Sequence, residues 1–205
     1  MLTSSLLNPA VICESAARLL FMNVQWIKSI GHFTSLPLQD QLLLLEESWR
    51  ELFILGAAQF LPISDLMPLV YSCGALDRTS AKSSFLQKTQ QFEEVLRNVR
   101  QFQLDNQEYT CLRAISLFRT SFETLTDPDR VASIQDDTQL ALNKYISTVH
   151  PTQPLRFGKL LLLLPTLKTV SGETIEDLFF RKTIANIPIV RIICDMYKSQ
   201  QTSSL

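Results

Sequence analysis

Apolar residues recur at three- and four-residue steps along most of the chain, a spacing that predicts α-helices. The first such stretch runs from about Val11 to Ile30, and its recurring positions are Ile12, Ala16, Leu19, Leu20, Val24 and Ile27. Gly31 ends this helix, and Pro37 suits the first turn of a second helix that reaches about Phe60. The second helix carries apolar residues on every face, so we expect it to be central and buried.

The helical pattern continues to the end of the chain with one interruption. Segment 61–78 contains Pro62, Pro68 and Gly74, and we expect it to be irregular, with a short strand or hairpin. Further helices are predicted over 85–102, 107–119, 128–149, from Pro154 onward with Pro165 kinking or breaking it, around 175–180, and from Pro188 to a polar tail. The sum is one all-α domain of roughly eight to ten helices over residues 11–198, between a lead-in of 1–10 and a tail of 199–205.

Composition supports a helical domain that acts through other molecules. Hydrophobic residues make up 46% of the chain, charged ones 19%, and there are five glycines, which favours long buried helices. A net charge of −1 gives no electrostatic reason to expect nucleic-acid binding by this chain itself. The four cysteines form no CxxC pair, which argues against a zinc site here. The apolar run Leu160–Leu164 is too short to span a membrane.

No residue pattern indicates catalysis. The two histidines, His32 and His150, lie beside predicted helix ends and have no nucleophile motif nearby in sequence, so we interpret them as boundary residues. The glycines are single, which excludes a glycine-rich phosphate loop. The sequence therefore predicts that the chain is not an enzyme.

Several blocks match a known family in order. The stretch Val24–Glu51 holds Trp26, Lys28, Phe33, Leu36, Asp40, Gln41, Trp49 and Glu51. The later blocks are HPTQP, RFGKLLLLLPTLKTVS, EDLFF and a closing IPI helix. Together they resemble the ligand-binding domain of nuclear receptors, and ESAARLLFM and DMYKS resemble the tailless-type orphan receptors within it.

The resemblance implies a three-layer antiparallel helical sandwich with its first helices absent or reduced. It also implies the regulatory domain of a nuclear transcription factor. Zinc and DNA binding would then belong to a domain outside this chain, and we expect no cofactor in the chain itself.

The resemblance further implies a groove that binds a partner helix. Lys28 matches the family's basic clamp and Asp195 its acidic clamp, which is normally Glu. The groove residues are expected to be Val24, Lys28, Gln41, Leu42, Leu45 and Glu46. The physical chemistry agrees, because a cation and an acid at opposite groove ends pair with the unpaired C=O and N–H groups of a short helix. The alternative is that Lys28 is a solvated helix end and Val24 is core.

In tailless-type receptors the last helix is thought to lie in the groove itself, in an autorepressed state. Its docking face here would comprise Ile192, Ile193, Met196 and Tyr197, beside Asp195. We therefore expect a repressor that recruits helical corepressor peptides, atrophin-like ones included. One alternative is a ligand-gated domain that recruits coactivators. A distant one is a helical lipid carrier or enzyme domain.

Two further functions follow from the resemblance. Phe60 occupies the position at which retinoid X receptors carry an arginine for the ligand's carboxylate. With Leu20, Phe21 and Phe53 it is expected to fill the pocket, which leaves the ligand unknown or absent. The leucine-rich helix matches the family's dimerisation helix, and its interface positions would be Leu161, Leu162, Pro165 and Lys168, with Leu163 adding apolar surface. A homodimer is therefore expected; the alternative is a central helix buried all round.

Overall fold

The computed structural model describes residues 8–63, 65–72, 82–184 and 187–199, and within these ranges all regular structure is helical. The predicted all-α class is therefore confirmed. The elements are α1 (Pro9–Lys28), α2 (Gly31–Thr34), α3 (Leu38–Phe60), α4 (Met67–Ser72), α5 (Lys82–Gln101), α6 (Asn106–Leu117), α7 (Pro128–Val149), α8 (Arg156–Leu167), α9 (Gly172–Ile175), the π-helical segment η2 (Glu176–Phe180), α10 (Arg181–Ile184) and α11 (Ile189–Ser199).

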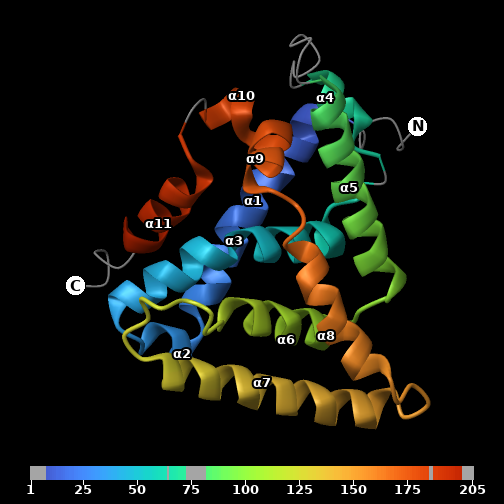
Figure 1. The fold of residues 1–205 in the computed structure, drawn as a ribbon. Coiled ribbons are helices and arrows are strands. Elements are labelled where there is room, and N and C mark those ends of the chain that lie inside the picture. The colour runs from blue at the N-terminus through green and yellow to red at the C-terminus, as the bar shows by residue number, and fades with distance from the viewer. Residues whose placement is uncertain (1–7, 64, 73–81, 185–186, 200–205) are drawn as a thin grey trace.

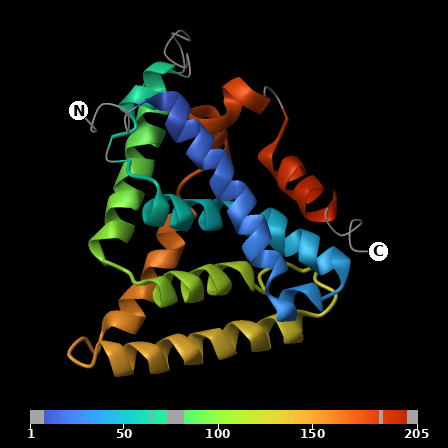
Figure 2. The ribbon, with the colours of Figure 1, turned by 180° about the vertical axis from the view of Figure 1, so that it is seen from behind.

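Helix α3 is the centre around which the other helices pack (Figure 1). It contacts α1 on one side and α5 and α8 on the other, while α6 lies beside it and α7 packs on α6. Figure 2 shows α1 in front of α3, with α8 behind the layer that holds α6. These are the three layers expected of the domain, and α11 covers one flank of α1 and α3.

The central position of α3 agrees with its burial. Its residues from Glu51 to Ala58 are all buried, including the small Gly56. A Cβ atom at position 56 would lie 3.3 Å from Cδ2 of Leu19, so glycine allows α1 to pack closely against α3 here. The α1 face that meets α3 includes Leu19 and Val24, which fits the predicted apolar spacing.

Local signals set most helix boundaries. Asn8 caps α1, and its side chain accepts a hydrogen bond from the Ala10 N–H at 3.0 Å. Asp127 caps α7 in the same way through the Arg130 N–H at 3.2 Å, as the Asp-Pro pair predicted. Asp105 and Glu108 form a capping box at the start of α6.

Three local expectations were wrong. The described part of segment 61–78 contains α4 and no strand, while residues 73–81 lie outside the described residues. Helix α8 begins at Arg156, two residues after Pro154. Pro165 does not break α8, which continues to Leu167; the proline lacks the N–H that would bond to the carbonyl of Leu161.

Two buried acids from the Val24–Glu51 stretch connect the layers. Asp40 is fully buried, and its carboxylate accepts hydrogen bonds from the N–H groups of Thr126 and Asp127 at 2.8 and 3.0 Å, which ties α3 to the start of α7. Glu51 accepts from the Arg119 guanidinium at 3.0 Å. These residues therefore stabilise the fold, since buried charges need such partners.

Candidate functional site

Helix α11 packs beside α1 and α3, with its C-terminal end near Lys28 of α1 and Gln41 of α3 (Figure 2). Its most buried residues are Ile189, Ile193 and Tyr197, which follow one another at four-residue steps. Of the predicted docking face, Ile193 and Tyr197 are buried, whereas Ile192 and Met196 are half-buried at the edges. Ile189 was missed, although the four-residue spacing from Ile193 could have indicated it.

The floor of the groove comes from α1 and α3. Val24 and Leu45 are each 1% exposed, and Leu42 is half-buried, so the predicted apolar residues lie beneath a covered surface. Glu46 is exposed and Gln41 is buried. The chain's own last helix packs against both of the helices that carry these residues.

Lys28 lies at the C-terminal end of α11. Its Nζ is 3.4 Å from the carbonyl oxygen of Met196 and 5.2 Å from the centre of the Tyr197 ring. A cation suits this position because the last carbonyls of a helix carry partial negative charge. Desolvation by burial lowers the pKa of the Lys28 ammonium group below its ordinary value. Lys28, which was predicted to be a basic clamp, therefore contacts the C-terminal end of α11.

Glu176 of η2 lies at the opposite end of α11. Its Oε1 accepts a hydrogen bond from the Ile189 N–H, the first of α11, at 3.0 Å. Asp195, predicted as the acidic clamp, belongs to α11 itself. Its side chain is exposed, so in this arrangement it does not hold the N-terminal end of α11. Sequence reasoning missed Glu176 because it lies on another element, thirteen residues before Ile189.

The Tyr197 side chain is fully buried between α2 and α3. Its hydroxyl donates a hydrogen bond to Oε1 of Gln41, and its ring meets that of Phe33 edge-on, with centroids 5.9 Å apart. Gln41 in turn donates through Nε2 to the carbonyls of Thr34 and Leu36 at 3.0 and 2.7 Å. Gln41 therefore connects the α2–α3 turn to the terminal helix.

The predicted pocket-filling residues divide into two pairs. Leu20 and Phe53 are buried, as expected. For Phe21 and Phe60 the expectation was wrong, because each is 48% exposed and points away from the interior. The Phe60 ring instead lies under the Arg113 guanidinium at 5.5 Å.

The Phe53 ring and three others fill the space between α3, α5 and η2. Phe53 meets Phe179 and Phe180 at centroid distances of 5.4 and 5.8 Å, and Phe92 meets Phe179 at 6.1 Å. All four side chains are at most 3% exposed. The part of the interior that this cluster occupies is therefore closed by the chain's own aromatic residues.

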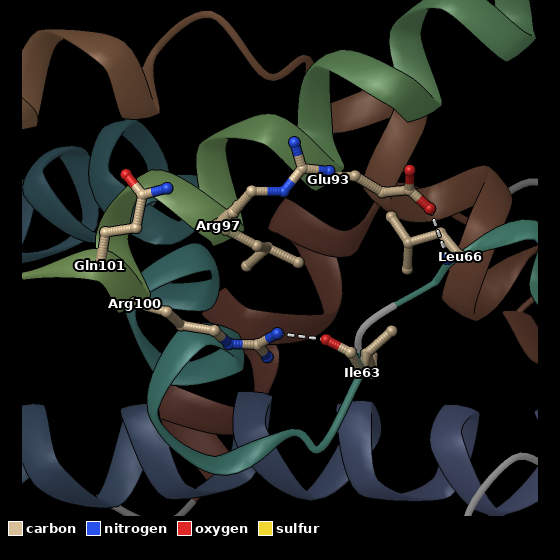
Figure 3. A pocket seen from close by; sticks show the side chains of 7 residues that line it. Ile63, Leu66, Glu93, Arg97, Arg100 and Gln101 are labelled. Atoms are coloured by element: carbon tan, nitrogen blue, oxygen red, sulfur yellow. Dashed lines mark hydrogen bonds between the residues drawn. The ribbon is translucent and has the colours of Figure 1, made fainter. Parts of the chain in front are cut away.

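A cavity of about 320 Å³ lies between the α3–α4 connection and α5 (Figure 3). Arg100 donates to four backbone carbonyls around the end of α3, namely those of Ala57, Ala58, Leu61 and Ile63. Glu93 accepts from the Leu66 N–H at 2.5 Å. The charged groups of this cavity thus hold the connection in place, which makes it a poor candidate for a ligand site.

A second cavity of about 660 Å³ lies between the start of α1 and the segment η2–α10. Cys13 and Glu14 line it from α1, and Asp177 and Arg181 form an ion pair on its other side. Phe179 and Phe180 line it from η2, so the rings that fill the interior also border this cavity.

A polar cluster joins α6, α7 and α8. Asp105, Glu108 and His150 bring ligand-type atoms within 4.8 Å of one another. However, Glu108 already binds Arg156 through both oxygens, at 2.6 and 2.7 Å. Asp105 accepts from the Glu108 N–H and the Tyr145 hydroxyl at 2.9 and 2.8 Å. We therefore interpret the cluster as a structural network in which His150, the C-cap residue of α7, is a boundary residue as predicted.

Helix α8 presents two faces. Leu162 is 75% exposed, Pro165 and Lys168 are exposed, and Leu161 is half-buried, so the predicted dimer positions are accessible. Leu163 was wrongly placed on this strip: it is 5% exposed because, with Leu160 and Leu167, it forms the helix row that faces the core.

No helix within the described ranges combines the length and apolarity needed to cross a membrane.

Comparison with known proteins gives one consistent result. Residues 3–184 match the family model for the ligand-binding domain of nuclear hormone receptors. The chain is 40% identical over 230 aligned residues to Protein tailless of Drosophila virilis, covering 97% of this chain and 51% of that protein. It is 42% identical over 199 residues to the steroid receptor seven-up, isoforms B/C, of Drosophila melanogaster, covering 94% of this chain and 36% of that protein. It is 41% identical over 202 residues to nuclear receptor subfamily 2 group F member 5 of Danio rerio, covering 97% of this chain and 50% of that protein. The chain thus spans about half or less of the length of these relatives.

Proposed function

The chain belongs to the family of nuclear hormone receptor ligand-binding domains, and from this premise we propose that it acts as the repressing regulatory domain of a tailless-type orphan receptor. Members of this family are transcription factors rather than enzymes, and their ligand-binding domains typically dimerise and bind coregulators. In this proposal the domain recruits helical corepressor peptides, atrophin-like ones among them, and its groove is autorepressed without a hormone.

The occupied groove is the observation that carries the proposal. In this proposal α11 takes the place of a coactivator helix; Glu176 and Lys28 contact its two ends at 3.0 and 3.4 Å. Each contact of a charge with a helix end contributes about 0.3–1 kcal/mol, and burial of the α11 face adds more. A coactivator must therefore displace a helix that is already well held.

The closed interior supports independence from a hormone. Phe53, Phe92, Phe179 and Phe180 occupy space in which an apolar ligand would otherwise bind. Phe60, expected at the position of the arginine that would hold a ligand's carboxylate, lies at the surface against Arg113 and supplies no counter-charge to an acidic ligand.

Three further parts of the proposal concern the whole receptor. The exposed strip of α8 around Leu162 would form a homodimer, since single copies leave this leucine in water. DNA binding and its zinc ions would belong to a separate domain. The receptor would act in the nucleus, where homologous transcription factors work.

Removal of the terminal helix tests the proposal. We expect a chain without residues 188–205 to bind a fluorescent corepressor peptide at least as tightly as the intact chain, and coactivator peptides more tightly. Occupancy of the groove by α11 for nine-tenths of the time would weaken apparent affinity about tenfold, and its removal would restore it.

Lys28→Ala is best compared in the shortened chain, because in the intact chain Lys28 also holds α11. There we expect weaker peptide binding, with Lys144→Ala, an exposed lysine of α7, as the matched control. If deletion abolished corepressor binding while the intact domain bound coactivators, the alternative of a ligand-gated activator would replace this proposal.

A further inference from the structure

The polar cluster that joins α6, α7 and α8 does not satisfy all of its atoms. Nε2 of His150 is shielded from solvent and makes no hydrogen bond with any described residue. It faces Oδ2 of Asp105 and Oε1 of Glu108, each 3.8 Å away. A normal N–H···O hydrogen bond is no longer than about 3.2 Å, so neither carboxylate satisfies this nitrogen. Buried polar atoms in folded proteins are nearly always paired, and the exception here points to a missing partner.

The ends of two helices hold the three side chains in place. The start of α6 and the end of α7 meet beside the start of α8 (Figure 1). Asp105 is the N-cap of α6 and Glu108 lies in its first turn, where the two form a capping box, while His150 is the C-cap residue of α7. Groups that are already fixed in this way lose little conformational entropy when they bind an ion.

The hydrogen bonds of the cluster leave a lone pair on each oxygen that faces His150. Oδ2 of Asp105 accepts from the Tyr145 hydroxyl at 2.8 Å, and Oε1 of Glu108 accepts from Nε of Arg156 at 2.6 Å. The other two carboxylate oxygens take the capping N–H groups and the second contact of Arg156. Since each carboxylate oxygen can accept two contacts, Arg156 and a cation can bind Glu108 together.

The cluster also carries an excess of negative charge. Two carboxylates face one guanidinium, that of Arg156, and the Tyr145 hydroxyl is neutral. Burial acts to raise the pKa of the Asp105 carboxyl group, but its hydrogen bonds outweigh burial and leave the pKa below its ordinary value, so the group is ionised at neutral pH. The positive end of α6 and the negative end of α7 largely cancel, because each is worth about half an elementary charge. One net negative charge therefore remains beside the unpartnered nitrogen of His150.

We propose that Asp105, Glu108 and His150 form a binding site for a divalent transition-metal ion of the zinc type. Such ions prefer an imidazole nitrogen together with carboxylate oxygens, whereas magnesium and calcium prefer oxygen alone. With metal–ligand bonds of about 2.0–2.1 Å, the ligands of a tetrahedral zinc ion lie roughly 3.3 Å apart. The two separations of 3.8 Å therefore need to shorten by about half an ångström. The Asp105 side chain is 37% exposed, which gives the ion a path of entry.

The role of this ion would be structural. Because Glu108 also binds Arg156 at the start of α8, the ion would hold the α7–α8 connection against α6. The site uses no cysteine, so the absence of a CxxC pair from the sequence does not argue against it. The assignment goes beyond the proposed function and does not depend on the position of α11.

Zinc titration of the metal-free chain, followed by calorimetry and by melting temperature, tests the site. We expect one zinc ion per chain and a higher melting temperature, because a ligand that binds only the folded state stabilises it. His150→Ala should weaken binding at least about tenfold, since the loss of groups that merely orient metal ligands already costs about 10–100-fold. His32→Ala changes the other histidine, at an exposed position, and as the matched control should bind zinc as the wild-type chain does.

A second variant and a spectroscopic probe identify the ligands. Asp105→Asn retains the cap of α6 but lacks the carboxylate charge, so it should also bind zinc less tightly. Circular dichroism checks that both variants are folded; if neither is, the absorption spectrum of cobalt bound to the wild-type chain decides. A spectrum of cobalt bound by nitrogen and oxygen, without a thiolate charge-transfer band, supports the site. A thiolate band would place the ion on cysteines and overturn it.

Three further results would contradict the assignment. Unchanged zinc affinity in a folded His150→Ala chain would place the ion elsewhere. Magnesium that bound as tightly as zinc would mean that the imidazole nitrogen takes no part. If the wild-type chain bound no zinc, the cluster would be a structural network alone. The proposed function would stand in each case, because none of these measurements involves peptide binding.

Discussion

At Arg156 one buried guanidinium joins α8 to the start of α6. It binds both oxygens of Glu108, whose side chain is fully buried, and also donates to the Phe102 carbonyl at 3.1 Å. Arg156→Ala would leave a carboxylate in the core without a counter-charge. We expect the free energy of unfolding in urea to fall by about 3–5 kcal/mol.

Lys159→Ala is the matched control for this prediction, because Lys159 lies one turn further along α8 and is exposed. It should change the free energy of unfolding by less than about 0.5 kcal/mol. If Arg156→Ala lowered the free energy of unfolding as little as Lys159→Ala, water would have to reach Glu108 once the arginine is removed.

The carboxyl group of Asp105 makes the stability of the fold depend on pH. Burial raises the pKa of its carboxyl group, but hydrogen bonds from the Glu108 N–H, the Tyr145 hydroxyl and the Gln107 N–H, with the nearby His150, outweigh burial and leave the pKa below its ordinary value. A lowered pKa in the folded state stabilises the fold above the unfolded value of about 3.9. That contribution is lost as pH falls from there through the folded pKa.

The measurement is urea unfolding between pH 6 and pH 3. Asn at position 105 can still cap α6 but does not titrate, so Asp105→Asn should be less stable than wild type near pH 6 and lose less on acidification. Asp136→Asn, at an exposed position of α7, should follow the wild-type profile. Parallel profiles for all three chains would contradict the role of the Asp105 charge.

Helix α8 shows how neighbouring leucines serve different purposes. Leu163 is 5% exposed and packs in the core, whereas Leu162 is 75% exposed on the expected dimer strip. Leu163→Ala should lower the free energy of unfolding by about 2–5 kcal/mol. Leu162→Ala should leave it within about 0.5 kcal/mol but weaken self-association in sedimentation. A destabilised Leu162→Ala chain would argue that this strip packs within one copy.

Elements with strong periodicity or caps were predictable, and those defined by tertiary contacts were not. The Asp127-Pro128 start of α7 and the long buried α3 follow from local chemistry. Helix α4 was missed because Pro62, Pro68 and Gly74 suggested turns, while its buried Leu69 and Val70 are placed by packing. The run of five leucines in α8 could not be divided into core and surface without knowing which side α5 and α6 occupy.

At the scale of the whole molecule, the aromatic cluster decides whether the interior is open. Phe179 contacts Phe53, Phe92 and Phe180 and is 2% exposed. Phe179→Ala should cost about 3–5 kcal/mol and leave an apolar cavity. We expect benzene to raise the melting temperature of this variant more than that of wild type.

Phe60→Ala is the matched control, because Phe60 is a large aromatic residue at the surface. It should show a small stability change and no response to benzene. A response to benzene by the wild-type chain would mean that the interior already holds an accessible cavity.

The candidate site was predictable on the side that the signature residues form. Val24, Lys28, Leu42 and Leu45 lie on α1 and α3, the two helices that α11 contacts. The acid at the other end of α11 was not predictable. Glu176 lies near Ile189 only because the chain between η2 and α11 folds back to bring them together. Phe21 and Phe60 were placed inside by analogy, although each lies on a helix face that no neighbour among the described residues covers fully.

The short segment η2 has a consequence for communication across the domain. Within five residues it contains Glu176, which holds the N-terminus of α11, and Phe179 and Phe180, which close the interior. A molecule that entered by moving these rings would also shift the residue that retains the last helix. By thermodynamic reciprocity, a partner that removes α11 would lower the cost of opening the interior. The two sites are therefore linked through a single turn of π-helix, and occupancy of either one should be measurable as a change in affinity at the other.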